Sequence, residues 1–142
     1  MNQVVLDASV ILKWYLTDEE YGQKALGLLH QYISNELEIL APTLLEYEVV
    51  HGLLIAQKRG RIKEEKIITA IEGFIDLEIK LKNLSHFHSR VVHYGKVYHC
   101  SAYDASYLAV AEVEGATMIT SDEGLYNLVK KDLKWIKWIG DV

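Results

Sequence analysis

Carboxylates stand at four points of the sequence where the neighbouring residues are apolar and expected to be buried. Asp7 ends an apolar run near the start of the chain, and Asp122 directly follows another. Glu48 and Asp104 lie near the starts of two segments with helical periodicity. Carboxylates that share a partly buried pocket repel one another and lose hydration, so their pKa values rise unless a cation is present. If these four residues meet, they are typical of a site for a divalent ion.

The periodicity of the whole sequence predicts strands that alternate with helices. Predicted strands cover residues 3–8, 36–42, 78–84, 116–120 and 135–139, and predicted helices cover 17–33, 43–60, 62–77, 85–99, 101–115 and 123–131. Thr17 and Glu20 have the spacing of a capping box, and Gly60 and Gly115 are expected to end their helices. Such alternation predicts a three-layer α/β/α sandwich with a mostly parallel sheet.

This fold class would bring the four acids to one edge of the sheet. Each helix returns antiparallel to the strands, so helices begin near the carboxyl ends of the strands, where open α/β sheets bind their ligands. Oxygen ligands favour Mg²⁺ or Mn²⁺ over Zn²⁺, and such an ion can activate water for attack on a phosphodiester. Each acid alone also has an ordinary structural interpretation: Asp7 as a cap, Asp104 as a partner of the helix dipole, and Asp122 as a turn residue.

Four short segments resemble those of PIN-domain ribonucleases and, within that class, VapC-type toxins. They are "VVLDASVIL", "APTLLEYEVVHGL", "YDASYLAVAE" and "ATMITSDEGL", which follow the order of the family across almost the whole chain. The resemblance implies that the catalytic residues and metal ligands are Asp7, Glu48, Asp104 and Asp122, supported by Ser9, Thr120 and Ser121. It also implies an α/β/α fold, Mg²⁺ or Mn²⁺ as cofactor, RNA as substrate, a cognate VapB-type antitoxin and a homodimer.

Two positions near the second predicted strand depart from the family or complicate the assignment. His51 stands where these toxins commonly have Asn. Glu46 is a further acid close to Glu48, and the two point some 200° apart on a helix at about 100° per residue. The helix is apolar nearly all round, so its periodicity does not choose between them. The family spacing from Pro42 favours Glu48.

Composition limits the other possibilities. A chain of 142 residues suits a single domain, here residues 1–142, and its formal net charge of −5 argues against nucleic-acid binding by bulk charge. Basic residues gather locally at 57–63 and 130–137. The only cysteine, Cys100, permits no internal disulfide, and the sequence shows neither a signal peptide nor a membrane span, so a cytoplasmic protein is expected.

The sequence leaves several alternative functions open. A phosphatase of the haloacid-dehalogenase type needs a second acid where this chain has Ser9. A zinc site would have to come from His86, His88, His93 and His99, whose spacing is better suited to surface or capping roles. A stand-alone PIN nuclease in RNA processing and a non-catalytic PIN-fold binding module are the nearer alternatives. For the toxin, the resemblance implies that the antitoxin lies against the two helices that flank Gly60.

Overall fold

The computed structural model describes residues 2–142, and its centre is a sheet of five parallel strands. The strands are β1 (Asn2–Leu6), β2 (Leu37–Pro42), β3 (Lys80–Lys82), β4 (Thr117–Thr120) and β5 (Ile136–Trp138). Their spatial order is β3-β2-β1-β4-β5, and every neighbouring pair is parallel. The predicted parallel α/β architecture is therefore confirmed, with β1 in the middle.

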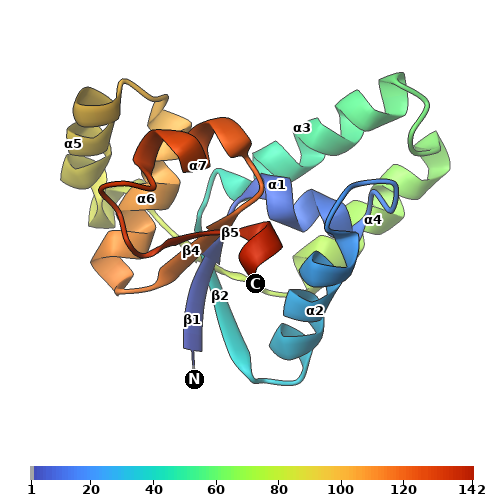
Figure 1. Cartoon of the computed structure of the whole chain (residues 1–142). Coiled ribbons are helices and arrows are strands. Elements are labelled where there is room, and N and C mark those ends of the chain that lie inside the picture. The colour runs from blue at the N-terminus through green and yellow to red at the C-terminus, as the bar shows by residue number, and fades with distance from the viewer. Residues whose placement is uncertain (1) are drawn as a thin grey trace.

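Helices cover both faces of this sheet. They are α1 (Ala8–Ile11), α2 (Gly22–Ile33), α3 (Leu45–Lys58), α4 (Glu64–Asp76), α5 (His88–Tyr98), α6 (Ala102–Glu114) and α7 (Glu123–Val129). Figure 1 shows α5, α6 and α7 on one side of the strands and α2 on the other, while α3 and α4 form a pair that extends beyond the sheet. The arrangement is the three-layer sandwich predicted from the alternating pattern.

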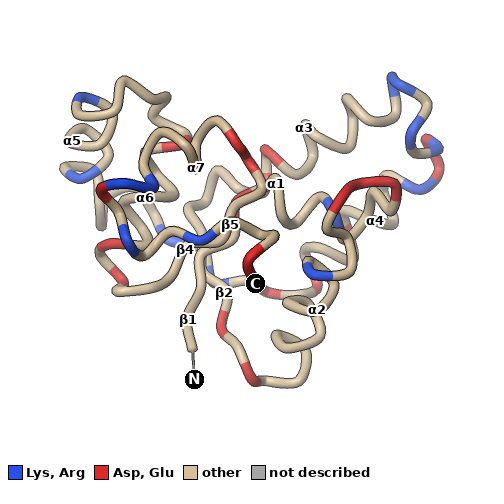
Figure 2. The backbone as a smooth tube through the Cα atoms, viewed as in Figure 1, with Lys and Arg blue, Asp and Glu red and all other residues tan. Residues whose placement is uncertain are grey.

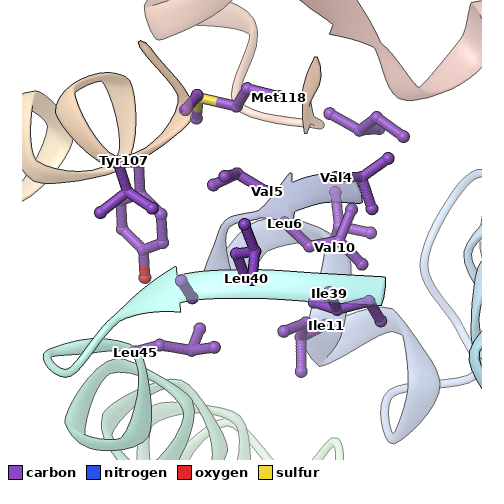
Figure 3. Close-up of a cluster of buried hydrophobic side chains, with 14 of the residues drawn as sticks. Val4, Val5, Leu6, Val10, Ile11, Ile39, Leu40, Leu45, Tyr107 and Met118 are labelled. Carbon is purple, nitrogen blue, oxygen red and sulfur yellow. The ribbon is translucent and has the colours of Figure 1, made fainter. Parts of the chain in front are cut away.

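The core explains why the strands are so uniformly apolar. Val5 and Leu6 of β1, Ile39 and Leu40 of β2, and Met118 of β4 are 0% exposed. These side chains lie together between the helical layers (Figure 3). A parallel sheet with both faces covered buries successive residues of its central strands, which replaces the usual alternation with a continuous hydrophobic run.

The segment between β1 and α2 differs from the prediction. The short helix α1 and a 3₁₀ turn at Leu12–Trp14, called η1, follow β1 directly, where no helix was expected. Helix α2 begins only at Gly22, after Tyr21 in the left-handed conformation (φ 64°), so the predicted capping box of Thr17 and Glu20 is wrong.

Ion pairs keep the residues before α2 in a loop. Arg61, in the turn between α3 and α4, donates two hydrogen bonds of 2.9 Å to Asp18 and one of 2.8 Å to Glu19. The buried Lys13 of η1 pairs with Glu19 at 3.3 Å. These contacts tie the loop to the α3–α4 turn, and such tertiary contacts readily override a weak local preference for helix.

Three glycines shape the helix that follows β2 and the one that precedes β4. A Cβ added to Gly52 of α3 would lie 2.4 Å from a Leu12 methyl carbon, so any larger residue would force the Leu12 side chain of η1 to move. Gly60 (φ 72°) follows the end of α3 and Gly115 (φ 64°) caps α6, both in the left-handed region that favours glycine. The two predicted helix ends are confirmed.

Within residues 2–142, no helix is both long and apolar enough to cross a lipid bilayer.

Candidate functional site

The turns after β1 and β4 carry two of the four acids. Within the sheet, β2 lies on one side of β1 and β4 lies on the other, so the chain leaves β1 in one direction and later returns to its other neighbour. This is the switch point at which open α/β sheets bind ligands. Asp7 caps α1 by accepting from the backbone N–H of Val10, and Asp122 caps α7 by accepting from that of Leu125. Asp7 is therefore the cap that was expected, whereas Asp122 is a helix cap instead of the expected turn residue.

Hydroxyl groups join these two turns around Asp7. Thr120 donates a hydrogen bond to one carboxylate oxygen of Asp7 and accepts one from the backbone N–H of Asp122, at 3.0 Å. Ser9 donates to the other oxygen of Asp7 and accepts from the backbone N–H of Ser121, also at 3.0 Å. Ser9 and Thr120 thus fix the orientation of the buried acid, and Ser121 contacts it only through Ser9.

The environment of Asp7 favours its neutral form. The residue is 6% exposed, and burial raises the pKa of its carboxyl group from 3.8 to about 6. The hydrogen bonds from Ser9 and Thr120 act in the opposite direction, while the negative charge of Asp122 raises this pKa further. Asp7 would therefore gain stability as an anion if a cation came within reach.

Glu48 approaches the same edge from α3 and is held by a residue that the site prediction missed. The hydroxyl of Tyr107, on α6, donates a hydrogen bond of 2.5 Å to Glu48 Oε1. Burial raises the pKa of Glu48, the Tyr107 hydroxyl lowers it, and the charge of Asp104 raises it. The ring of Tyr107 belongs to the hydrophobic cluster, with its oxygen directed out of it (Figure 3). Its place three residues after Asp104, on one helical face, was the signal available in the sequence.

Asp104 completes the group from the first turn of α6. Its backbone N–H is capped by the hydroxyl of Ser101 at 3.0 Å, and its side chain is half-buried. Burial raises its pKa, and the charge of Asp122 raises it further. Since Asp122 also acts on Asp7, and Asp104 on Glu48, mutual repulsion links all four acids.

The four acids meet at one edge without forming a closed cage. Within residues 2–142, no group of three or more His, Cys, Asp or Glu side chains is close enough to hold a metal ion, and this includes the histidines considered for zinc. None of the four acids has a Lys or Arg ion-pair partner in the described part of the chain. An all-oxygen set of uncompensated negative charges has the chemistry of a site for a hard divalent cation.

Comparison with known proteins identifies the family of the chain. Residues 4–131 match the family model described as the PIN domain. The chain belongs to the PIN domain family. A comparison with curated protein sequences finds no significant match.

Solved structures share the fold of this PIN domain at low sequence identity. The protein PAE2754 of Pyrobaculum aerophilum superposes with a TM-score of 0.66 and 21% identity, covering 99% of this chain and 92% of that one. A chain of a toxin–antitoxin complex from Klebsiella pneumoniae gives 0.59 and 16%, with coverage of 94% and 95%. VapC20 of Mycobacterium tuberculosis, a toxin that cleaves the sarcin–ricin loop, gives 0.60 and 12%, with coverage of 87% and 93%.

The two glutamates of α3 provide a first test of the site in this PIN domain. Glu46 is exposed, whereas Glu48 is half-buried and bonded to Tyr107. If the chain cleaves RNA with a divalent ion, as its resemblance implies, we expect Glu48→Gln to slow that cleavage by about tenfold or more, because it removes one charge from the group. Glu46→Gln, the matched control, should retain the rate of the unmodified chain. The opposite pattern in initial-rate measurements would show that Glu46 is the functional acid.

Tyr107→Phe tests whether the orientation of Glu48 matters. We expect a loss of about 1 kcal/mol in unfolding free energy, the usual contribution of one buried hydrogen bond, and a lower rate of any RNA cleavage that depends on Glu48. Tyr32→Phe is the control, since it removes a comparable hydrogen bond of 2.6 Å, to the carbonyl of Leu77, far from the acids. Urea unfolding and cleavage rates should show similar stability losses but a slower rate only for Tyr107→Phe. Equal rates in the two variants would assign Tyr107 a purely structural role.

Proposed function

We propose that this PIN domain is a metal-dependent endoribonuclease that acts as the toxin of a VapBC-type pair. The observation that carries the proposal is the convergence of four acids from four separate elements at the switch point, without a Lys or Arg ion-pair partner in residues 2–142. A non-catalytic PIN-fold module would have no need of these uncompensated charges, which lower the stability of the fold.

Different residues would have different roles in this reaction. Mg²⁺ or Mn²⁺ would be held by Asp7, Glu48, Asp104 and Asp122, whose side chains would have to draw closer together than they lie in this structure. When bound, such an ion activates water and neutralises charge on the phosphodiester. Ser9 and Thr120 keep Asp7 aimed into the site, and Tyr107 does the same for Glu48. Asp104 and Asp122 are more accessible than Asp7 and are the acids that can approach the water and the RNA.

The toxin part of the proposal is supported by two structural neighbours, one a toxin and the other a chain of a toxin–antitoxin complex. We propose an antitoxin that lies along α3 and α4, together with a homodimer as the working form. A pocket of about 500 Å³ between η1 and α4, lined by Trp14, Tyr15 and Ile62 among others, offers apolar anchor points beside the α3–α4 turn. Lys58, Arg59 and Lys63 remain for steering an acidic partner, whereas Arg61 is occupied by Asp18 and Glu19.

Co-expression tests this proposal as a whole. The chain is produced alone and together with the protein of the adjacent reading frame, and both preparations are assayed on RNA with Mn²⁺ and with EDTA. We expect cleavage with Mn²⁺ alone, loss with EDTA, and suppression by a co-purifying small protein. Metal-dependent cleavage that no co-purifying protein suppresses would favour a stand-alone nuclease in RNA processing. No cleavage under any of these conditions would contradict the nuclease.

A further inference from the structure

Two tyrosines beside the acids are unusually exposed. Tyr47 of α3 is 81% exposed and Tyr103 of α6 is 63% exposed. Together with Leu44, Glu48 and His51 they line a pocket of about 350 Å³. A pocket of this size is within the range that small-molecule ligands occupy. Because Glu48 lines it, whatever fills the pocket lies directly beside the proposed reaction site.

The chain uses its other tyrosines differently. Tyr21 and Tyr126 pack against Trp138, and Tyr94 stacks on Tyr98. Tyr103 instead stands between two hollows, because it also lines a second pocket of about 250 Å³ that includes Phe87. Large aromatic surfaces are costly to leave in water, so this placement indicates a ligand with a flat apolar face.

The charges around this pocket limit how a ligand can be attracted to it. The chain carries a formal net charge of −5, and the four acids at this edge repel a phosphate backbone. Figure 2 shows the Lys and Arg residues gathered at the α3–α4 turn, on α5 and in the α7–β5 segment, while acidic segments begin α3 and α7. Attraction between phosphates and basic side chains is therefore weak at this edge, and RNA needs another source of affinity close to the reacting bond. Stacking of a base on an aromatic ring supplies about 1–3 kcal/mol per base and depends little on base identity.

We propose that Tyr47 and Tyr103 form a stacking site for an unpaired base of the RNA next to the phosphate that is cleaved. This inference rests on the proposed nuclease function and assigns two residues of this chain to the surface that would hold the RNA. A base within a duplex is stacked and paired with its neighbours, whereas an unpaired base can turn into an aromatic pocket. His51, on the rim of the same pocket, offers ring nitrogens for hydrogen bonds to a base edge.

A second copy of the chain is the competing occupant. Tyr47, His51 and Leu54 lie at helical spacing on the exposed face of α3, which is a possible surface for another helix. A protein side chain permanently seated in the pocket would, however, cover Glu48 and close the edge that RNA must reach. The pocket's continuity with the acids therefore favours the base.

RNA binding without cleavage tests the site. A short fluorescein-labelled single-stranded RNA is titrated with the full chain in EDTA, and anisotropy gives the affinity. We expect Tyr47→Ala and Tyr103→Ala to weaken binding roughly 5- to 150-fold each, the range that corresponds to losing one stacked base. Tyr47→Phe should bind nearly normally, because phenylalanine keeps the stacking face. Ile33→Ala, at an apolar residue 62% exposed at the end of α2, is the control and should change nothing.

Two further measurements complete the experiment: the affinity for a duplex of the same sequence, and the oligomeric state of each variant. The tyrosine variants should leave the weak binding of the duplex unchanged, and with Mn²⁺ they should raise KM more than they lower kcat. Unchanged affinity for single-stranded RNA in both alanine variants would overturn the stacking site while leaving cleavage by the unmodified chain, and so the nuclease, intact. Binding that depends on the two tyrosines, without any cleavage, would support the stacking site and contradict the nuclease. If sedimentation shows that Tyr103→Ala dissociates a dimer while RNA affinity is unchanged, the surface belongs to a second copy and the stacking site is overturned.

Discussion

Asp104→Asn is expected to abolish RNA cleavage almost completely. The substitution keeps the size of the side chain and its place in the first turn of α6 but removes one of the four repelling charges. A divalent ion contributes several kcal/mol to stabilising the transition state, and each 1.36 kcal/mol corresponds to a factor of ten in rate. We therefore expect the initial rate with Mn²⁺ to fall by at least about a hundredfold.

A matched variant separates this loss from a general effect of removing an acid. Asp76, at the end of α4, is an exposed aspartate near the opposite edge of the sheet, because α4 leads into the start of β3. Asp76→Asn should cleave RNA at the rate of the unmodified chain. Undiminished cleavage by Asp104→Asn, in a preparation free of contaminating nuclease, would contradict the proposed mechanism.

The architecture could be predicted because its decisive signals are local. Both faces of the sheet are covered, so strands such as Val4–Leu6 and Ile39–Ala41 are apolar at every position. Gly60 and Gly115 marked helix ends because only glycine readily adopts the left-handed conformation found there. The short helix α1 and the late start of α2 were not predictable in this way. Helix α1 is a single turn capped by Asp7, too short to produce a periodic pattern, and the loop before α2 is tied by a contact between Arg61 and Asp18, which lie 43 residues apart.

The position of the four acids at one edge of the sheet was predictable, but the hydrogen bonds that hold them there were not. Asp7 and Asp122 follow β1 and β4, so the order of elements was enough to place them at one edge. The choice between Glu46 and Glu48 needed the rotation of α3, which Leu45 and Val49 fix by packing into the core. Tyr107 was missed as a site residue because an aromatic side chain on a buried helix is ordinarily a core residue. Only the folded chain brings its hydroxyl to Glu48.

Asp7 should make the stability of the metal-free protein depend on pH. A group whose pKa rises on folding binds its proton more tightly in the folded state, so stability falls as pH increases from the unfolded to the folded pKa. A rise in the pKa of Asp7 from 3.8 to about 6 corresponds to about 3 kcal/mol of unfolding free energy. The folded state loses this stability only when Asp7 is ionised. Glu48 and Asp104, whose pKa values are also raised, act in the same direction, while Asp18 and Glu112 act in the opposite one.

Comparison with Asp7→Asn isolates this contribution. The variant has no ionisable group at this position, and its altered hydrogen bonds with Ser9 and Thr120 add an offset that does not vary with pH. In EDTA, the unfolding free energy of the unmodified chain should fall relative to that of the variant by about 3 kcal/mol between about pH 4 and pH 7.5. A constant difference over this range in urea unfolding would show that Asp7 is not held in a costly anionic state.

The same cost predicts how a metal ion should act on stability. A cation that binds the ionised Asp7 in the folded state, and not in the unfolded chain, stabilises the fold by about 2.7 kcal/mol at a free concentration a hundred times its dissociation constant. For a domain of this size, that corresponds to a rise in Tm of about 5–10 °C. At neutral pH we expect Mn²⁺ to raise the Tm of the unmodified chain and of Asp76→Asn by this amount, and that of Asp7→Asn by much less. The gain should fade below about pH 6, where protons compete with the ion for Asp7. An equal rise in Tm for Asp7→Asn and the unmodified chain would mean that the ion binds elsewhere.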